Sequence, residues 1–261
     1  MSKSRAAYYK QMKRQEQQKL QDHIIHELVM EKRKKMPRLG GKKLYRLVHT
    51  SMEEHLISMG RDKFFSWLKA HDLLVRPKKR FTKTTHSLHR FRVHKNLIKD
   101  IEITRPDQLW VSDITYLKLQ KGFCYLALIT DVYSRKIIGY DISQSLELTG
   151  CLRALRMACE QRKIPHTVHH SDRGIQYCSK PYIDHLKENQ IQISMAEAGN
   201  CYENAIAERV NGILKDEFNL DRLFNDLKDA QKATWQAIET YNTERPHMAI
   251  GMKMPCELYA A

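Results

Sequence analysis

The segment after Arg105 constrains the fold most strongly, because three strand-like runs follow one another there with only short turns between them. DQLWVSDITYLKL (107–119) alternates apolar and polar residues, and FCYLALITDVY (123–133) and KIIGYDIS (136–143) follow it. Turns this short join neighbouring antiparallel strands. The sequence therefore predicts an antiparallel meander.

Helix and strand patterns alternate after the meander. The expected helices span 147–163, 180–189, about 203–219 and about 225–242, and the expected strands span 166–172 and 191–195. Antiparallel strands followed by alternating helix and strand are typical of an α/β domain of the ribonuclease H type. We expect a ribonuclease H-like core: a mixed sheet of about five strands flanked by helices, preceded by a small all-α basic domain.

Three helices are expected before the sheet, over 1–36, about 42–50 and about 52–69, with Pro37 and Gly40-Gly41 between the first two. Short helices around a glycine turn fit a helix-turn-helix-like DNA-binding region, and equally any small helical bundle. The expected organisation is a helical region over 1–73, a basic linker over 74–103 and the α/β core over 104–261.

The formal charge of +15 is unevenly distributed along the chain. Residues 1–100 hold 26 Lys and Arg against 9 Asp and Glu, whereas the rest holds 19 against 21. Such clustering favours a polyanion partner, most often nucleic acid, over a merely soluble basic surface. The linker either follows a DNA backbone or is a disordered charged tether, and its expected DNA contacts are Arg76, Lys78, Lys79 and Arg80.

The cysteines and the hydropathy exclude other classes of protein. Six cysteines are scattered without a CxxC pair, which indicates reduced cytosolic thiols and neither a disulfide framework nor a zinc site. No run of 18 apolar residues is present, and the N-terminus shows no signal peptide.

Two aspartates interrupt strand patterns at notable places. Asp113 lies inside the first strand, where a charged side chain costs free energy unless it is paired or binds a metal. Asp172 ends the 166–172 strand, and α/β sheets bind ligands at the carboxyl ends of strands. Taken alone, Asp113 is more often a solvent-exposed carboxylate at a strand edge, and an ordinary turn aspartate is a common alternative for Asp172.

Glu208 lies on a polar stripe of the 203–219 helix. On a helical wheel Asn204, Glu208, Asn211 and Lys215 fall within about 60° of one another. A solvated helix face is the common meaning of such a stripe, but small neighbours and the AGNCYENA loop before it favour a ligand site. Carboxylates converging from separate elements suit Mg²⁺, which prefers oxygen ligands.

The chain resembles the insertion-sequence transposases of the IS3 type, which have a retroviral-integrase-like Asp-Asp-Glu catalytic core. Asp172 and Glu208 are separated by the family's 35 intervening residues, 173–207. The motifs that carry the resemblance are WVSDITY (110–116), TDVYSRKIIGY (130–140), HHSDRGIQY (169–177), GNCYENAIAERVNGILKDE (199–217) and YNTERPH (241–247).

The resemblance implies a role for each matching residue. Asp113, Asp172 and Glu208 would be catalytic and bind Mg²⁺ or Mn²⁺, and Lys215 would contact DNA near the cut. Water would nick a strand, and a DNA 3′-OH would attack in strand transfer. Further residues expected to shape the site or hold DNA are His170, Arg173, Gly174, Gln176, Asn204 and Asn211.

The resemblance also implies partners: double-stranded DNA at the element ends and target, further copies of the chain on that DNA, and a helix-turn-helix partner or fusion encoded by an upstream frame. It implies a cytoplasmic, DNA-associated bacterial protein. Two other functions remain open from the residues: a non-catalytic DNA-binding regulator on the same scaffold, and a ribonuclease H-type nuclease acting on RNA–DNA hybrids.

We predict that DNA binding depends steeply on salt, because the basic residues 1–100 would displace counterions from phosphates. Affinity measured between 50 and 200 mM salt should fall by on the order of a hundredfold or more. A chain lacking residues 1–100 that bound DNA as tightly as the full chain would refute the role of this charge.

Overall fold

The structure is a computed structural model that describes residues 5–76, 94–99, 101–197 and 204–260. These residues form two compact units, one within 1–77 and the other within 78–261. Among the described residues, no helix is both long and apolar enough to cross a membrane. The cysteines that the structure describes are free thiols.

The first unit contains the helices α1 (Arg5–Lys35), α2 (Gly41–Glu54) and α3 (Arg61–Ala70). Its core forms only around the C-terminal half of α1, where Ile25 and Val29 are fully buried, whereas Leu20 is 62% exposed. Side chains also link the helices, because Trp67 Nε1 donates to Asp22 Oδ1 at 3.1 Å. This unit is the expected small all-α region.

The expected helix over 52–69 is wrong at its start. Residues 52–54 belong to α2, and α3 begins after Gly60. The chain leaves the helical conformation between them, because Leu56 has a φ of +58°. A bulky residue in that left-handed region marks a turn.

The second unit is built on a six-stranded sheet with the order β3-β2-β1-β4-β5, and β6 pairs with β1. The strands are β1 (Leu109–Leu119), β2 (Phe123–Asp131), β3 (Ile137–Ser143), β4 (Val168–Ser171), β5 (Gln192–Met195) and β6 (Leu223–Phe224). The first three form the predicted antiparallel meander, and β4 and β5 add parallel strands. The expectation of about five strands missed β6, whose two residues are too short to show a period.

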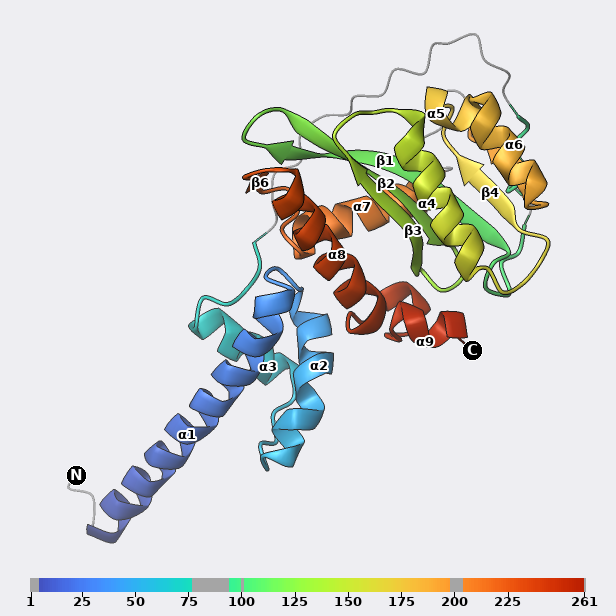
Figure 1. The fold of residues 1–261 in the computed structure, drawn as a ribbon. Helices are drawn as coiled ribbons and strands as arrows, with labels where there is room; N and C mark the ends of the chain where they lie inside the picture. The colour runs from blue at the N-terminus through green and yellow to red at the C-terminus, as the bar shows by residue number, and fades with distance from the viewer. Residues whose placement is uncertain (1–4, 77–93, 100, 198–203, 261) are drawn as a thin grey trace. The chain divides into compact units, whose positions relative to one another are not determined.

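Helices cover both faces of this sheet, as Figure 1 shows for α4 in front of the strands and α7 behind them. Gly139 on β3 allows close packing of α4, because a Cβ there would lie 2.1 Å from the Ala154 carbonyl oxygen. The helices and helical turns are α4 (Leu148–Gln161), α5 (Ile175–Cys178), α6 (Lys180–Glu188), α7 (Ala205–Glu217), α8 (Leu227–Thr243), η2 (Met248–Ile250) and α9 (Pro255–Ala260).

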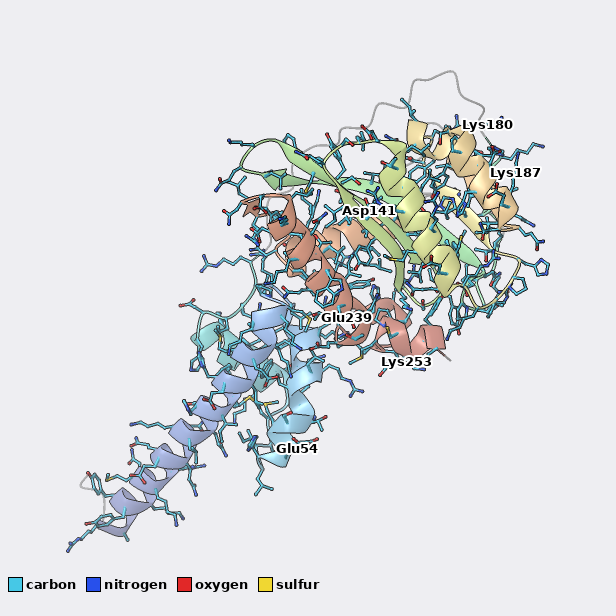
Figure 2. The ribbon with its side chains drawn as sticks, viewed as in Figure 1. Glu54, Asp141, Lys180, Lys187, Glu239 and Lys253 are labelled. Carbon is cyan, nitrogen blue, oxygen red and sulfur yellow. The ribbon has the colours of Figure 1, made fainter. Side chains whose placement is uncertain are left out.

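Charged side chains tie these helices to the sheet and to one another. Asp141 on β3, labelled in Figure 2, accepts a hydrogen bond of 2.7 Å from Arg153 Nε of α4. The buried Asp107 carboxylate accepts from Trp110 Nε1 at 3.1 Å and from the Tyr259 hydroxyl of α9 at 2.8 Å. The C-terminal helix is therefore anchored to the start of β1.

β1 is paired on both sides except over a short stretch. β4 pairs with it only as far as Ser112, and β6 pairs with it only from Lys118. Residues 113–117 have β2 on one side, and their other edge is left for side chains to cover. This interruption in the sheet is where the candidate site lies.

The buried ion pair between α7 and the segment after α8 should be essential for stability. Arg245 is 2% exposed and donates to both carboxylate oxygens of Glu217, at 2.9 and 3.0 Å. Arg245→Met would leave the Glu217 carboxylate buried without the guanidinium, so we predict a loss of about 3–5 kcal/mol in the free energy of unfolding, measured with urea.

Arg222→Met provides the control, because it breaks the more exposed Arg222–Asp229 pair, which is 2.9 Å long. Its cost should stay below about 1 kcal/mol. If the two substitutions lowered the free energy of unfolding equally, burial of the Glu217–Arg245 pair would not determine how much it stabilises the fold.

Candidate active site

The three predicted carboxylates lie on elements that border the interrupted edge of β1. Asp113 follows the last β4 pairing on β1, Asp172 directly follows β4, and Glu208 lies in the first turn of α7. Asp113 and Asp172 are half-buried, and Glu208 is exposed. Residues far apart in the sequence thus border one place on the sheet.

The Asp113 carboxylate is crowded by negative charge. Burial, followed by the charge of Asp172, raises its pKa to about 7, and the charge of Glu208 adds to this shift. A hydrogen bond from Asn211 Nδ2 to Asp113 Oδ2, at 2.7 Å, acts in the opposite direction. Asp113 and Asp172 are therefore close enough to repel each other, as a pair of cation ligands would be before the cation binds.

The turn after β4 orients Asp172. The backbone N–H of Gly174 donates to Asp172 Oδ1 at 2.9 Å. A Cβ at position 174 would lie only 2.9 Å from that same oxygen, so a larger residue would displace the carboxylate. The absence of a side chain at Gly174 therefore leaves room for the Asp172 carboxylate.

Two asparagines of the polar stripe attach α7 to the edge of β1. Asn204 Nδ2 donates to the Ser112 carbonyl at 3.1 Å, and Asn211 reaches Asp113. Both asparagines are buried, so the interpretation of the stripe as a solvated face is wrong for these two positions. Each also has a buried side-chain oxygen without a hydrogen-bond partner among the described residues.

Lys215 completes the stripe at the next turn of α7. Its ammonium lies 4.5 Å from the centroid of the Tyr116 ring. Burial lowers its pKa, and the charge of Asp113 raises it again, so the lysine is close to the carboxylates. A half-buried cation beside a crowded carboxylate group is suited to hold a phosphate.

A buried polar group beneath the site was not recognised from the sequence. Ser112 Oγ lies 2.6 Å from His169 Nε2, and the Tyr182 hydroxyl lies 3.0 Å from the same nitrogen. Burial, with a smaller effect of His170, lowers the His169 pKa to about 3, so the ring is neutral. The pair links β1 to β4, the strands that position Asp113 and Asp172. The signal for this pair in the sequence was a polar residue on the inward face of each of the two strands.

The other residues expected to shape the site or to bind DNA lie in several different parts of the structure. His170 Nδ1 lies 2.8 Å from Ser194 Oγ, and Gln176 donates to the Leu146 carbonyl. Arg173 Nε donates to the Ala196 carbonyl at 2.8 Å. Arg76 is exposed in the first unit, and Lys78, Lys79 and Arg80 lie outside the described residues.

The donor set fits a hard divalent cation, although no cluster of three or more potential ligands is already closed around a point in the described part of the chain. Asp113, Asp172 and Glu208 offer oxygen ligands only, as Mg²⁺ and Mn²⁺ prefer. A bound cation would compensate the negative charges that make Asp113 and Asp172 repel each other. The side-chain oxygens of Asn204 and Asn211, which have no hydrogen-bond partner among the described residues, are further acceptors near these carboxylates.

Crowding at Asp113 predicts a dependence of stability on pH in the absence of metal. Its pKa lies above the unfolded value of 3.8, so ionisation destabilises the fold as the pH rises from about 4 to about 7. Asp113→Asn removes the charge and keeps an acceptor for Asn211. In EDTA at pH 8 we expect it to raise the free energy of unfolding by at least about 1 kcal/mol, with little difference at pH 4.

Asp229→Asn is the control with the opposite sign. A backbone hydrogen bond from Asn225 and the Arg222 side chain lower the pKa of Asp229, so its ionised form stabilises the fold. This variant should lose stability at pH 8. An Asp113→Asn protein less stable than wild type at pH 8 would contradict the crowding of the two carboxylates.

Similarity to known proteins places this arrangement in a family. The Integrase core domain family matches residues 103–201, and a second Integrase core domain family matches residues 189–255. The chain of a simian T-cell lymphotropic virus intasome structure is similar in fold, with a TM-score of 0.51, 18% identity, and coverage of 85% of this chain and 75% of that chain. The ribonuclease H-like fold is thereby confirmed.

Bacterial relatives are more similar in sequence. The 31 kDa protein of insertion element IS600 from Shigella sonnei is 37% identical over 80% of this chain and 78% of its own length. Transposase InsF of IS3fB from Escherichia coli K12 is 34% identical over 72% and 66%, and the IS629 transposase of Shigella sonnei is 39% identical over 59% and 52%. The chain belongs to the IS3-type insertion-sequence transposases, which contain an integrase core.

Proposed function

We propose that this protein cuts and joins DNA strands in transposition, with Asp113, Asp172 and Glu208 as the catalytic residues that hold Mg²⁺ or Mn²⁺. The observation that supports it most is the crowding of Asp113 by Asp172 and Glu208 at the interrupted edge of β1. Divalent cations bound by such carboxylates activate an attacking oxygen and stabilise the leaving oxygen in phosphodiester displacement.

The side chains around the carboxylates have positioning roles in this proposal. Asn211 donates a hydrogen bond to one carboxylate oxygen of Asp113, and the Gly174 N–H donates one to a carboxylate oxygen of Asp172. These bonds would fix the orientation of both carboxylates and leave their other oxygens to bind the cation. Asn204 fixes the start of α7, and thereby Glu208, against β1. A fixed ligand set loses little entropy when substrate binds, which lowers the barrier of the step.

Lys215 would hold the phosphate that reacts. Its ammonium lies beside Asp113 and Tyr116, where it can pair with a non-bridging oxygen of the DNA backbone. The nucleophiles are water for nicking and a DNA 3′-OH for strand transfer, so no side chain forms a covalent intermediate with DNA. The joining of two DNA ends needs at least two active sites, and we therefore expect an oligomer on DNA.

The basic region before the core would bring DNA to this site. Its positive charge supplies affinity that is independent of sequence. Recognition of the element ends would come from the helical region, or from a helix-turn-helix partner or fusion encoded by an upstream frame. Both assignments belong to the proposal, as does the helix-turn-helix character of residues 1–73.

We predict that Asp113→Asn, Asp172→Asn and Glu208→Gln each reduce Mg²⁺-dependent cleavage and strand transfer by at least about a thousandfold, because the three act as one unit. Cleavage is measured on DNA that carries the element ends, and binding is followed by mobility shift. Binding should stay within about twofold of wild type, since the phosphate contacts remain.

Glu188→Gln on α6 is the matched control, because it removes an exposed carboxylate outside the site. It should cleave like wild type. Normal strand transfer by any of the three site variants would defeat the assignment. Cleavage of RNA–DNA hybrids without strand transfer would favour a ribonuclease H-type nuclease, and DNA binding without cleavage by the wild type would favour a regulator.

A further inference from the structure

Two aromatic rings are exposed on the β1–β2 hairpin, next to the candidate active site. Tyr116 is 44% exposed and Phe123 is 49% exposed. Their centroids are 5.3 Å apart, and the rings meet edge to face at 83°. The contact holds the two rings in a fixed relation while leaving about half of each side chain to solvent.

Tyr116 and Asp113 point to opposite faces of β1, and the two side chains are connected around the open edge of the strand by Lys215. Tyr116 is three residues from Asp113 along β1, which corresponds to about 10 Å of extended strand. Lys215 connects the two places, because its ammonium lies over the Tyr116 ring and also within the electrostatic reach of Asp113. A DNA strand that is bound at the carboxylates and follows Lys215 around the open edge of β1 would therefore reach the rings.

The surroundings of the rings are basic. Lys118 and Lys121 are exposed on the hairpin, and the stretch from Ile114 to Phe123 contains no acidic residue. Lys118 lies close enough to Lys215 to repel it, while Asp221 and Asp113 act in the opposite direction. A polyanion would relieve the repulsion between the two lysines, so the charge around the rings is complementary to a phosphate backbone.

We propose that Tyr116 and Phe123 form a stacking platform for an unpaired base of the DNA strand at the active site, with Lys118, Lys121 and Lys215 holding the neighbouring phosphates. Bases inside a continuous duplex have both faces covered, so away from a duplex end exposed rings can stack only on a base that is unpaired or flipped out. Aromatic rings interleaved with lysines are a common way to bind single-stranded nucleic acid. This inference rests on the proposed function, because it takes the strand at Asp113 as the substrate.

A protein partner fits the rings less well. Stable protein interfaces bury roughly 1,200–2,000 Å² in total, and lysines are depleted from them. Two half-exposed rings among three lysines offer neither a large apolar area nor an uncharged one. The occupant that the chemistry favours is therefore a nucleic-acid strand.

The test compares two DNA probes bound to the full chain in EDTA, so that nothing is cleaved. One is a blunt duplex, and the other carries a four-nucleotide single-stranded 3′ tail with the fluorescent base 2-aminopurine. Phe123→Ala and Tyr116→Ala should weaken binding of the tailed probe by on the order of tenfold, and should abolish the fluorescence quenching that stacking causes. Binding of the blunt duplex should change less than twofold.

Two further variants separate stacking from folding and from general apolar contact. Phe123→Trp keeps an aromatic face and should retain affinity and quenching. Leu223→Ala removes an exposed apolar side chain from β6, which pairs with β1 at Lys118, and should leave both probes unaffected. Thermal unfolding of each variant shows whether the fold persists.

Equal weakening of both probes by Phe123→Ala, or unchanged quenching, would overturn the platform. So would a change in oligomeric state by sedimentation without an effect on DNA, which would assign the rings to a second copy of the chain. Because binding is measured without metal, these outcomes are independent of cleavage. Unchanged binding and quenching of the tailed probe by both alanine variants, with normal cleavage by the wild type, refutes only the platform, whereas absent cleavage by the wild type refutes the proposed function.

Discussion

The site depends on how the edge of β1 is covered. β4 stops at Ser112 and β6 starts at Lys118, so the backbone between them is open to side chains from α7. Asn204 donates a hydrogen bond to the Ser112 carbonyl, as a neighbouring strand would, and Asn211 donates one to the Asp113 carboxylate. Buried backbone groups must be hydrogen-bonded, and here that requirement also brings the helix with Glu208 to the two aspartates. The Asn204 contact that satisfies the Ser112 carbonyl thus also helps to assemble the candidate active site.

Charge at this place opposes folding and favours binding. The Asp113 pKa of about 7 reflects burial and repulsion from Asp172, both of which a divalent cation would relieve. The polar pair Ser112–His169 lies under the same strands and holds β1 beside β4 without adding charge, because the ring is neutral. The fold therefore supports a group of carboxylates that is unfavourable alone and suited to binding cations.

The proposed work is divided along the chain by charge. The basic excess lies in the first hundred residues, and the rest of the chain is close to neutral. A strongly positive surface around the carboxylates would pair with them and occupy the place of the metal, so a near-neutral core is compatible with a cation site. Lys215, which lies over the Tyr116 ring, and the exposed hairpin lysines Lys118 and Lys121 are the local exception.

The sequence by itself determined the meander and the alternation of helix and strand after it, because these depend on local periodicity, and its motif spacing singled out the three carboxylates as candidates. It did not show β6, which is too short for a period, or the break between α2 and α3, which depends on the left-handed backbone conformation of Leu56. Only the tertiary structure decided that Asn204 and Asn211 are buried against β1 while Glu208 stays exposed, since a helical wheel gives direction but not what lies there. The repulsion at Asp113, the Ser112–His169 pair and the Glu217–Arg245 pair likewise join residues distant in sequence, and such contacts exist only once the chain has folded.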